Sequence, residues 1–133
     1  MAKKIRIFIV EDDPILSLYL GHELTEIGYD VVGSAESGEE ALNRIPEVKP
    51  EFVFMDISLK GSIDGIEAAS QLRTKYPVPF VFLTGFADEE TRQRAKVTQP
   101  CGYILKPFDP AELHAVIRLG IPNLSESGEA KLI

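Results

Sequence analysis

One stretch constrains the fold more than any other, because four apolar residues (Phe52 to Met55) lead directly into Asp56. A run without polar alternation is typical of a strand buried on both faces, as in the middle of a parallel sheet. Such a strand delivers its last residue to the carboxyl edge of the sheet, where open α/β folds bind ligands. The pattern therefore predicts that Asp56 is the reactive group of a functional site.

Four other short apolar segments alternate with helix signals along the chain. These further strands are expected at residues 5–10, 80–83 and 103–105, together with a short strand that starts at 31–32. The helices are expected at residues 14–27, 38–45, 66–76, 88–97 and 110–120. Alternation of this kind predicts an α/β fold with right-handed crossovers and helices on both faces. We expect a doubly wound, flavodoxin-like (βα)5 domain whose five parallel strands lie in the order 2-1-3-4-5.

The expected helix boundaries rest on capping residues and prolines. Four helices should begin at an acidic or hydroxyl N-cap, namely Asp13, Ser37, Asp64 and Asp109. Pro46 is expected to end the second helix after Ile45. The fourth helix has a poor apolar stripe, so it should be held weakly against the sheet.

Length and charge narrow the possible classes of protein. The 133 residues fit one domain, expected at 1–120, and residues 121–133 lose periodicity like a tail or the start of a linker. A net charge of −7 argues against direct nucleic-acid binding and against an anionic membrane surface. No apolar run approaches the roughly 20 residues of a membrane span. With a single cysteine, Cys101, the composition favours a cytoplasmic location.

Polar residues follow each of the core strands. They are Glu11 and Asp12, Asp56, Thr84 and Lys106. In a parallel sheet these ends meet at one edge, so three carboxylates should lie in one cleft and repel one another unless a cation joins them. Hard oxygen ligands without His or Cys favour Mg²⁺ over zinc.

A lysine and a hydroxyl beside such a metal are groups that hold a phosphoryl oxygen, which predicts phosphoryl transfer onto a carboxylate. Asp56 is then the nucleophile and also a metal ligand. Thr84 donates a hydrogen bond to the phosphoryl group, and Lys106 neutralises its charge. A backbone carbonyl just after Asp56, most simply that of Ser58, can complete the protein ligands of the metal.

Five motifs in this order resemble the receiver domain of two-component response regulators, over roughly residues 4–120. They are IVEDD at 9–13, FMDIS at 54–58, Asp64-Gly65, FLTG at 82–85 and YILKPF at 103–108. The resemblance implies that Asp56 is the phosphoacceptor and that Thr84 and Lys106 contact the phosphoryl group. It also implies that Mg²⁺ is bound by Glu11, Asp12 and the Ser58 carbonyl, together with Asp56.

The same resemblance implies a switch and a set of partners. Tyr103 would be the aromatic switch that swings inward as Thr84 moves, and the peptide bond between Lys106 and Pro107 would be cis. The donor would be a phosphohistidine on a sensor histidine kinase or phosphotransfer protein. A downstream partner or a dimer is expected on the face formed by the fourth helix, the last strand and the fifth helix. The domain would be a phosphoacceptor rather than an enzyme.

Three alternatives stay open at this point. A small Mg²⁺-dependent phosphatase with an aspartyl-phosphate intermediate shares the chemistry, but such enzymes commonly have a second Asp where this chain has Ser58. An interaction module that is never phosphorylated has no need of the complete acid set. An FMN carrier would need a phosphate-binding loop after the first strand. His22 and His114 are both expected on the surface.

Overall fold

The computed structural model describes residues 3–85 and 88–121, over which five strands alternate with five helices. The strands are β1 (Arg6–Val10), β2 (Asp30–Ala35), β3 (Phe52–Asp56), β4 (Phe80–Thr84) and β5 (Gly102–Leu105). The helices are α1 (Pro14–Ile27), α2 (Gly38–Val48), α3 (Gly65–Lys75), α4 (Glu89–Val97) and α5 (Pro110–Gly120). The strands form one parallel sheet in the order β2-β1-β3-β4-β5. The predicted doubly wound fold and its strand order are confirmed.

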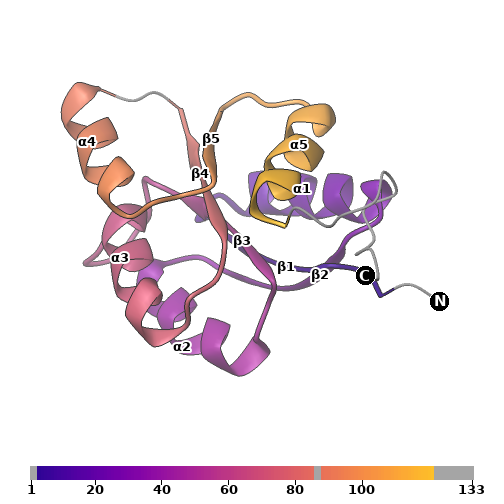
Figure 1. Cartoon of the computed structure of the whole chain (residues 1–133), viewed down its shortest axis with the longest axis horizontal. Coiled ribbons are helices and arrows are strands. Elements are labelled where there is room, and N and C mark those ends of the chain that lie inside the picture. The colour runs from indigo at the N-terminus through magenta and orange to yellow at the C-terminus, as the bar shows by residue number, and fades with distance from the viewer. Residues whose placement is uncertain (1–2, 86–87, 122–133) are drawn as a thin grey trace.

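The helices cover both faces of the sheet (Figure 1), with α1 and α5 on one face and α2, α3 and α4 on the other. Side chains alternate along each strand, so β3 sends Val53 and Met55 to one core cluster and Phe52 and Phe54 to the other. Every residue of β3 is buried. Burial on both faces is the reason for the uninterrupted apolar run that precedes Asp56.

The predicted N-caps are confirmed. Asp13, Ser37, Asp64 and Asp109 each accept a hydrogen bond from a backbone N–H in the first turn of the helix that follows. These side chains satisfy donors that have no partner inside the helix. The caps fix where α1 and α3 begin, and both helices start directly after loops that carry acidic residues.

The predicted end of the second helix is wrong. Helix α2 continues past Ile45 to Val48, with Pro46 inside its last turn, and ends at Lys49 in a left-handed conformation with φ of 56°. Ile45 is fully buried against the sheet. Packing of this apolar face therefore outweighs the hydrogen bond that the proline removes. The second strand, Asp30–Ala35, is also longer than predicted, because it pairs with all of β1.

His22 is exposed as predicted, whereas His114 is half-buried and its Nε2 atom is enclosed. The Tyr29 hydroxyl lies 2.6 Å from His114 Nδ1, and the two rings are 5.8 Å apart. Burial raises the pKa of Tyr29 to about 12, so the phenol stays protonated at neutral pH. This contact ties α5 to the segment between α1 and β2.

Within the described ranges, none of the helices is long and apolar enough to cross a membrane. The predicted tail at 121–133 lies outside the described residues, apart from Ile121.

Candidate functional site

Asp56 is the last residue of β3, and its side chain is almost fully buried at the carboxyl edge of the sheet. Its Oδ1 accepts a hydrogen bond from the Ser58 backbone N–H at 3.1 Å. Its Oδ2 accepts one from Lys106 Nζ at 3.0 Å. The two contacts hold the carboxylate in one orientation at the position where β1 and β3 lie side by side.

Glu11 and Asp12 follow β1 at the same edge. The Glu11 N–H donates to the Ala35 carbonyl at 3.0 Å, which continues the strand pairing one residue past β1 and turns the side chain inward. Carboxylate oxygens of Glu11, Asp12 and Asp56 all lie within 4.8 Å of one another. The structure therefore brings together the three acids that the sequence singled out.

Lys106 reaches the acids from the loop after β5. Its Nζ lies 3.0 Å from both Glu11 Oε1 and Asp56 Oδ2, and its backbone N–H donates to the Thr84 carbonyl at 2.8 Å. The peptide bond between Lys106 and Pro107 is cis. Burial alone would lower the pKa of Lys106, but the hydrogen bonds to Asp56 and Glu11 outweigh it, and the pKa lies above its ordinary value. The ammonium is thus charged at neutral pH.

Within this cluster the pKa of Glu11 is raised above its ordinary value. Burial raises the pKa of its carboxyl, and the hydrogen-bonded contact with Asp56 raises it further. The Asp13 N–H, which donates to Glu11 Oε2 at 3.1 Å, and the Lys106 ammonium lower the pKa by smaller amounts. The site therefore holds more negative charge than its own donors can stabilise.

The donor set fits a hard divalent cation. Three carboxylates face one ammonium, so three negative charges less one positive charge leave two negative charges in the cleft. All of the acidic ligand atoms are oxygens, which suits Mg²⁺ and does not suit softer metals. The residues that could hold the ion are Glu11, Asp12 and Asp56. The Ser58 carbonyl stays a predicted ligand.

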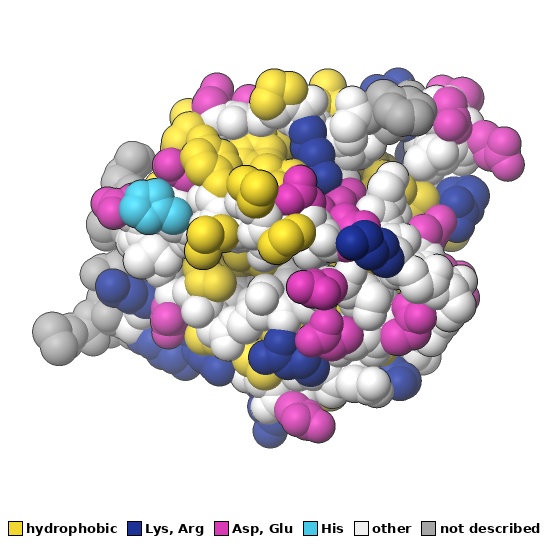
Figure 2. Space-filling model, turned by 180° about the vertical axis from the view of Figure 1, so that it is seen from behind, with side chains coloured by type: hydrophobic (Ala, Val, Ile, Leu, Met, Phe, Trp, Pro, Cys, Tyr) yellow, Lys and Arg dark blue, Asp and Glu magenta, His cyan; other side chains and the backbone are white. Residues whose placement is uncertain are grey.

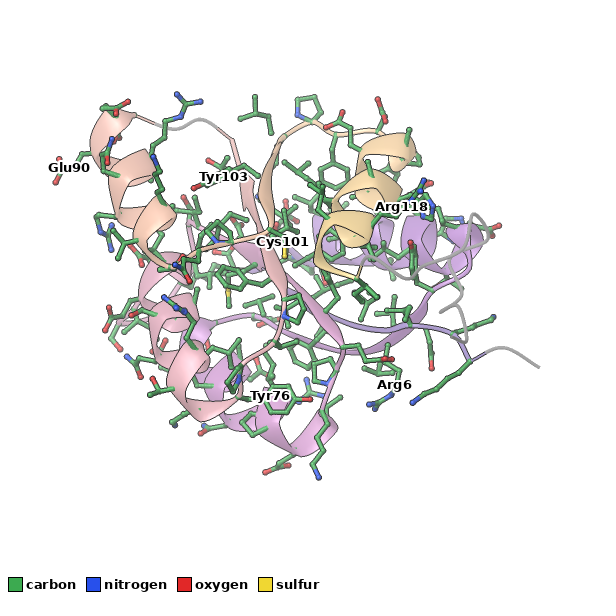
Figure 3. All side chains as sticks on the ribbon, in the orientation of Figure 1. Arg6, Tyr76, Glu90, Cys101, Tyr103 and Arg118 are labelled. Atoms are coloured by element: carbon green, nitrogen blue, oxygen red, sulfur yellow. The ribbon has the colours of Figure 1, made fainter. Side chains whose placement is uncertain are left out.

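Thr84 and Tyr103 lie next to this edge on β4 and β5. Leu83 is the register partner of Asp56, so Thr84 lies one residue further along, and it is buried. Tyr103 is 45% exposed, and its ring stacks on Phe82 with 6.1 Å between centroids. Figure 3 shows Tyr103 on the α4 side of β5. Both Thr84 and Tyr103 line a hollow of about 430 Å³ beneath α4.

Gly65 is a site residue whose role the sequence analysis missed. It is buried at the start of α3, and a Cβ at this position would lie 1.9 Å from the Asp56 carbonyl oxygen. Its N–H donates to the Ile57 carbonyl at 2.8 Å. Only glycine allows the backbone of α3 to approach the end of β3 this closely. The signal in the sequence was the glycine directly after the Asp64 cap.

Comparison with known proteins identifies this arrangement. The sequence profile of the response regulator receiver domain matches residues 7–118. The chain belongs to this family. It is a receiver domain of two-component signalling, and the phosphatase alternative is not favoured.

The receiver domain resembles parts of larger regulators. It is 35% identical over 121 residues to the transcriptional regulatory protein PdtaR of Mycobacterium tuberculosis, covering 91% of this chain and 58% of that protein. It is 33% identical over 114 residues to the alkaline phosphatase synthesis transcriptional regulatory protein PhoP of Bacillus subtilis, covering 85% and 47%. The chain thus spans about half the length of these relatives. Both are named as regulators and not as enzymes.

Solved structures agree with this assignment. The signal receiver domain of a modulated diguanylate cyclase from Desulfovibrio desulfuricans superposes with a TM-score of 0.86 at 38% identity, covering 90% of this chain and 95% of that one. The BeF3-activated receiver domain of Klebsiella pneumoniae RstA gives a TM-score of 0.78 at 33% identity, covering 86% and 97%. The sequence comparison and the structural comparison therefore assign the chain to the same family and the same fold.

Proposed function

We propose that this receiver domain accepts a phosphoryl group on Asp56, with Mg²⁺ bound by Glu11, Asp12 and Asp56. The observation that carries the proposal is the Asp56 carboxylate, which lies among two further acids and in contact with an ammonium. A carboxylate held in this way is a nucleophile for phosphorus, and the product of its attack is an acyl phosphate. The Ser58 carbonyl completes the proposed ligand set.

In the transfer step, an Asp56 oxygen bonds to the phosphorus of a phosphohistidine on a sensor kinase or phosphotransfer protein. The phosphorus–nitrogen bond breaks, its electron pair stays on the imidazole nitrogen, and that nitrogen takes up a proton. Bound Mg²⁺ would neutralise charge on the phosphoryl oxygens. Lys106 already contacts Asp56 Oδ2, so a short movement of its side chain brings the ammonium to the phosphoryl group.

We propose Thr84 and Tyr103 as the switch that reads the modification. Phosphorylation adds about 1.5 to 2 negative charges next to Thr84, whose hydroxyl can donate to the new oxygens. A shift of Thr84 opens room in the hollow that it shares with Tyr103, and the exposed ring can then move inward. Helix α4 borders this hollow and buries only Ala95 among its own residues, so its displacement costs little apolar contact.

The outward-facing surface formed by α4, β5 and α5 is the proposed contact for a downstream partner or a second copy. Its exposed apolar side chains are Val97, Tyr103, Leu105 and Leu119. This surface is adjacent to the proposed switch, so an inward movement of Tyr103 changes its shape. A cytoplasmic location and the lack of direct nucleic-acid binding stay predictions.

The kinase or phosphotransfer partner must reach Asp56 from the carboxyl edge of the sheet. Helix α1 begins at this edge, and its residues Ile15 and Leu18 are 79% and 77% exposed. Figure 2 shows hydrophobic side chains gathered on this side of the molecule. An apolar helix face beside the acceptor is a suitable contact for a helical phosphodonor.

The test is incubation of the purified chain with acetyl phosphate and MgCl₂, followed by intact mass measurement. We expect the mass of one added phosphoryl group in the wild type and in the control variant Asp30→Asn, whose side chain is exposed on β2. We expect none in Asp56→Asn or after removal of Mg²⁺ with a chelator. Labelling of Asp56→Asn to the same extent as the wild type would exclude Asp56 as the acceptor, and an unphosphorylated interaction module would show no labelling at all.

A further inference from the structure

The loop between β3 and α3, residues 57–64, is docked on the first turn of α2. Ser37 and Lys60 form an isolated parallel β-bridge. Glu39 Oε2 accepts hydrogen bonds from both the N–H and the Oγ of Ser62, each at 3.0 Å. Ile63 packs so close to Gly38 that a Cβ on this glycine would lie 2.8 Å from it. Figure 1 shows α2 and α3 side by side on this face of the sheet.

Glu39 is the polar centre of this contact. The Ser62 N–H, the N–H of Glu39 itself and the Ser62 hydroxyl lower the pKa of its carboxyl, so the side chain is ionised at neutral pH. Gly61 passes directly beneath the carboxylate with φ of +105°, and a Cβ there would lie 2.8 Å from both oxygens. The glycine and the acid are therefore matched to each other, because a side chain at position 61 would push the carboxylate away.

The other end of the same loop belongs to the candidate site. The Ser58 N–H donates to Asp56 Oδ1, and the Gly65 N–H donates to the Ile57 carbonyl. Between these anchored ends, Ser62 is exposed and is held by Glu39. The segment that contains Ser58 is thus continuous with a contact made on the far side of the loop.

We propose that Glu39 is a positioning residue, which holds the 57–64 loop in the conformation that presents the Ser58 carbonyl to Mg²⁺. The inference rests on the proposed function, since it assigns Glu39 to the same metal site. It makes the start of α2 part of the site, although Glu39 contacts neither the acids nor the phosphoryl group. The loop would lose a charged acceptor for two donors if Glu39 were truncated.

The experiment is a titration with MgCl₂ followed by the amide NMR signals of the chain, for the wild type, Glu39→Ala, Glu39→Gln and Ser62→Ala. The matched control is Glu36→Ala, which removes the same charge from an exposed residue of the same segment. The free energy of unfolding of each variant is measured in parallel. We expect Glu39→Ala to weaken Mg²⁺ binding by roughly three- to tenfold, the size of about one net hydrogen bond.

Glu39→Gln keeps a neutral acceptor and Ser62→Ala keeps the backbone donor, so both should bind Mg²⁺ with affinities between those of the wild type and Glu39→Ala. Glu36→Ala should bind as the wild type does. Unchanged Mg²⁺ affinity in Glu39→Ala would overturn the inference, even if the variant were less stable, because a purely structural role affects only unfolding. An equal loss in Glu36→Ala would also overturn it and assign the effect to net charge. Failure of the wild type to bind Mg²⁺ would instead overturn the proposed function, and the inference with it.

Discussion

Lys106 Nζ and Asp56 Oδ2 form a hydrogen-bonded ion pair of 3.0 Å between residues that are 50 positions apart in the sequence. The side chain of Asp56 is 4% exposed and that of Lys106 is 24% exposed, so water screens the pair only in part. The same ammonium is 3.0 Å from Glu11 Oε1. One lysine therefore holds together two acids that would otherwise repel each other.

Removal of this lysine should destabilise the metal-free protein. We expect Lys106→Ala to lower the free energy of unfolding by about 1–3 kcal/mol, because it leaves two buried carboxylates without their cation. Saturating MgCl₂ should reduce the difference in the free energy of unfolding between Lys106→Ala and the wild type, since an added cation replaces the missing charge. The measurement is urea unfolding with and without MgCl₂, and Lys75→Ala, on an exposed end of α3, serves as the control. An equal loss of stability with and without Mg²⁺ would contradict the charge argument.

The raised pKa of Glu11 predicts a dependence of stability on pH. Because the pKa is higher in the folded state than in the unfolded one, Glu11 contributes stability below its ordinary pKa of 4.5 and loses it as the pH rises through the folded value. Glu11→Gln cannot ionise, so the variant should gain in stability relative to the wild type as the pH rises. The range to measure is roughly pH 4 to 7, because it begins just below the ordinary pKa of a glutamate. Chelator-treated protein would be unfolded with urea at each pH. A difference in stability between the two proteins that does not change with pH would contradict the prediction.

Gly65 and Gly21 offer a matched pair of glycine substitutions. Gly65→Ala should destabilise the protein by about 1–3 kcal/mol or more and slow phosphorylation, because the new Cβ meets the Asp56 backbone. Gly21→Ala should stabilise it by about 0.5–1 kcal/mol, since the nearest atom to a Cβ inside α1 is at 3.8 Å and alanine favours a helix. Thermal unfolding and acetyl phosphate labelling check both effects. Equal stability of the two variants would disprove the close approach at Gly65.

Thr84 should couple the phosphoryl group to Tyr103. We expect Thr84→Ala to be phosphorylated about tenfold more slowly, which is the effect of one lost hydrogen bond. Once labelled, its Tyr103 ring signals should stay at their unphosphorylated positions in NMR spectra, whereas those of the wild type and of the exposed control Thr74→Ala should shift. If the Tyr103 signals of labelled Thr84→Ala shifted as far as those of the wild type, Thr84 would not couple the phosphoryl group to Tyr103. The movement of Tyr103 would then depend on another contact.

Much of the architecture followed from local sequence signals. Asp13, Ser37, Asp64 and Asp109 cap their helices because an N-cap needs only a short acceptor and the next three residues. The alternation of strands and helices implied a parallel sheet, and a parallel sheet brings the ends of its strands to one edge. That geometric rule is why the sequence alone predicts that Glu11, Asp12 and Asp56 lie together.

Other features depended on contacts between distant segments, which no local pattern specifies. Helix α2 continues through Pro46 because Ile45 packs into the core, and His114 is half-buried beside the Tyr29 hydroxyl. The Gly65 contact with Asp56 and the docking of Ser62 on Glu39 are of the same kind.

The chemistry of the cleft follows from residue types and strand order, because these decide which groups reach the carboxyl edge. The pairing of those groups, that is, which oxygen of Asp56 faces Lys106 and which faces the Ser58 amide, follows from the packed domain. The two differ in the distance along the chain over which the underlying interactions act. Strand and helix signals act over a few residues, whereas hydrogen bonds and charge pairs in a buried site act through space, between atoms whose separation depends on the packing of the whole domain.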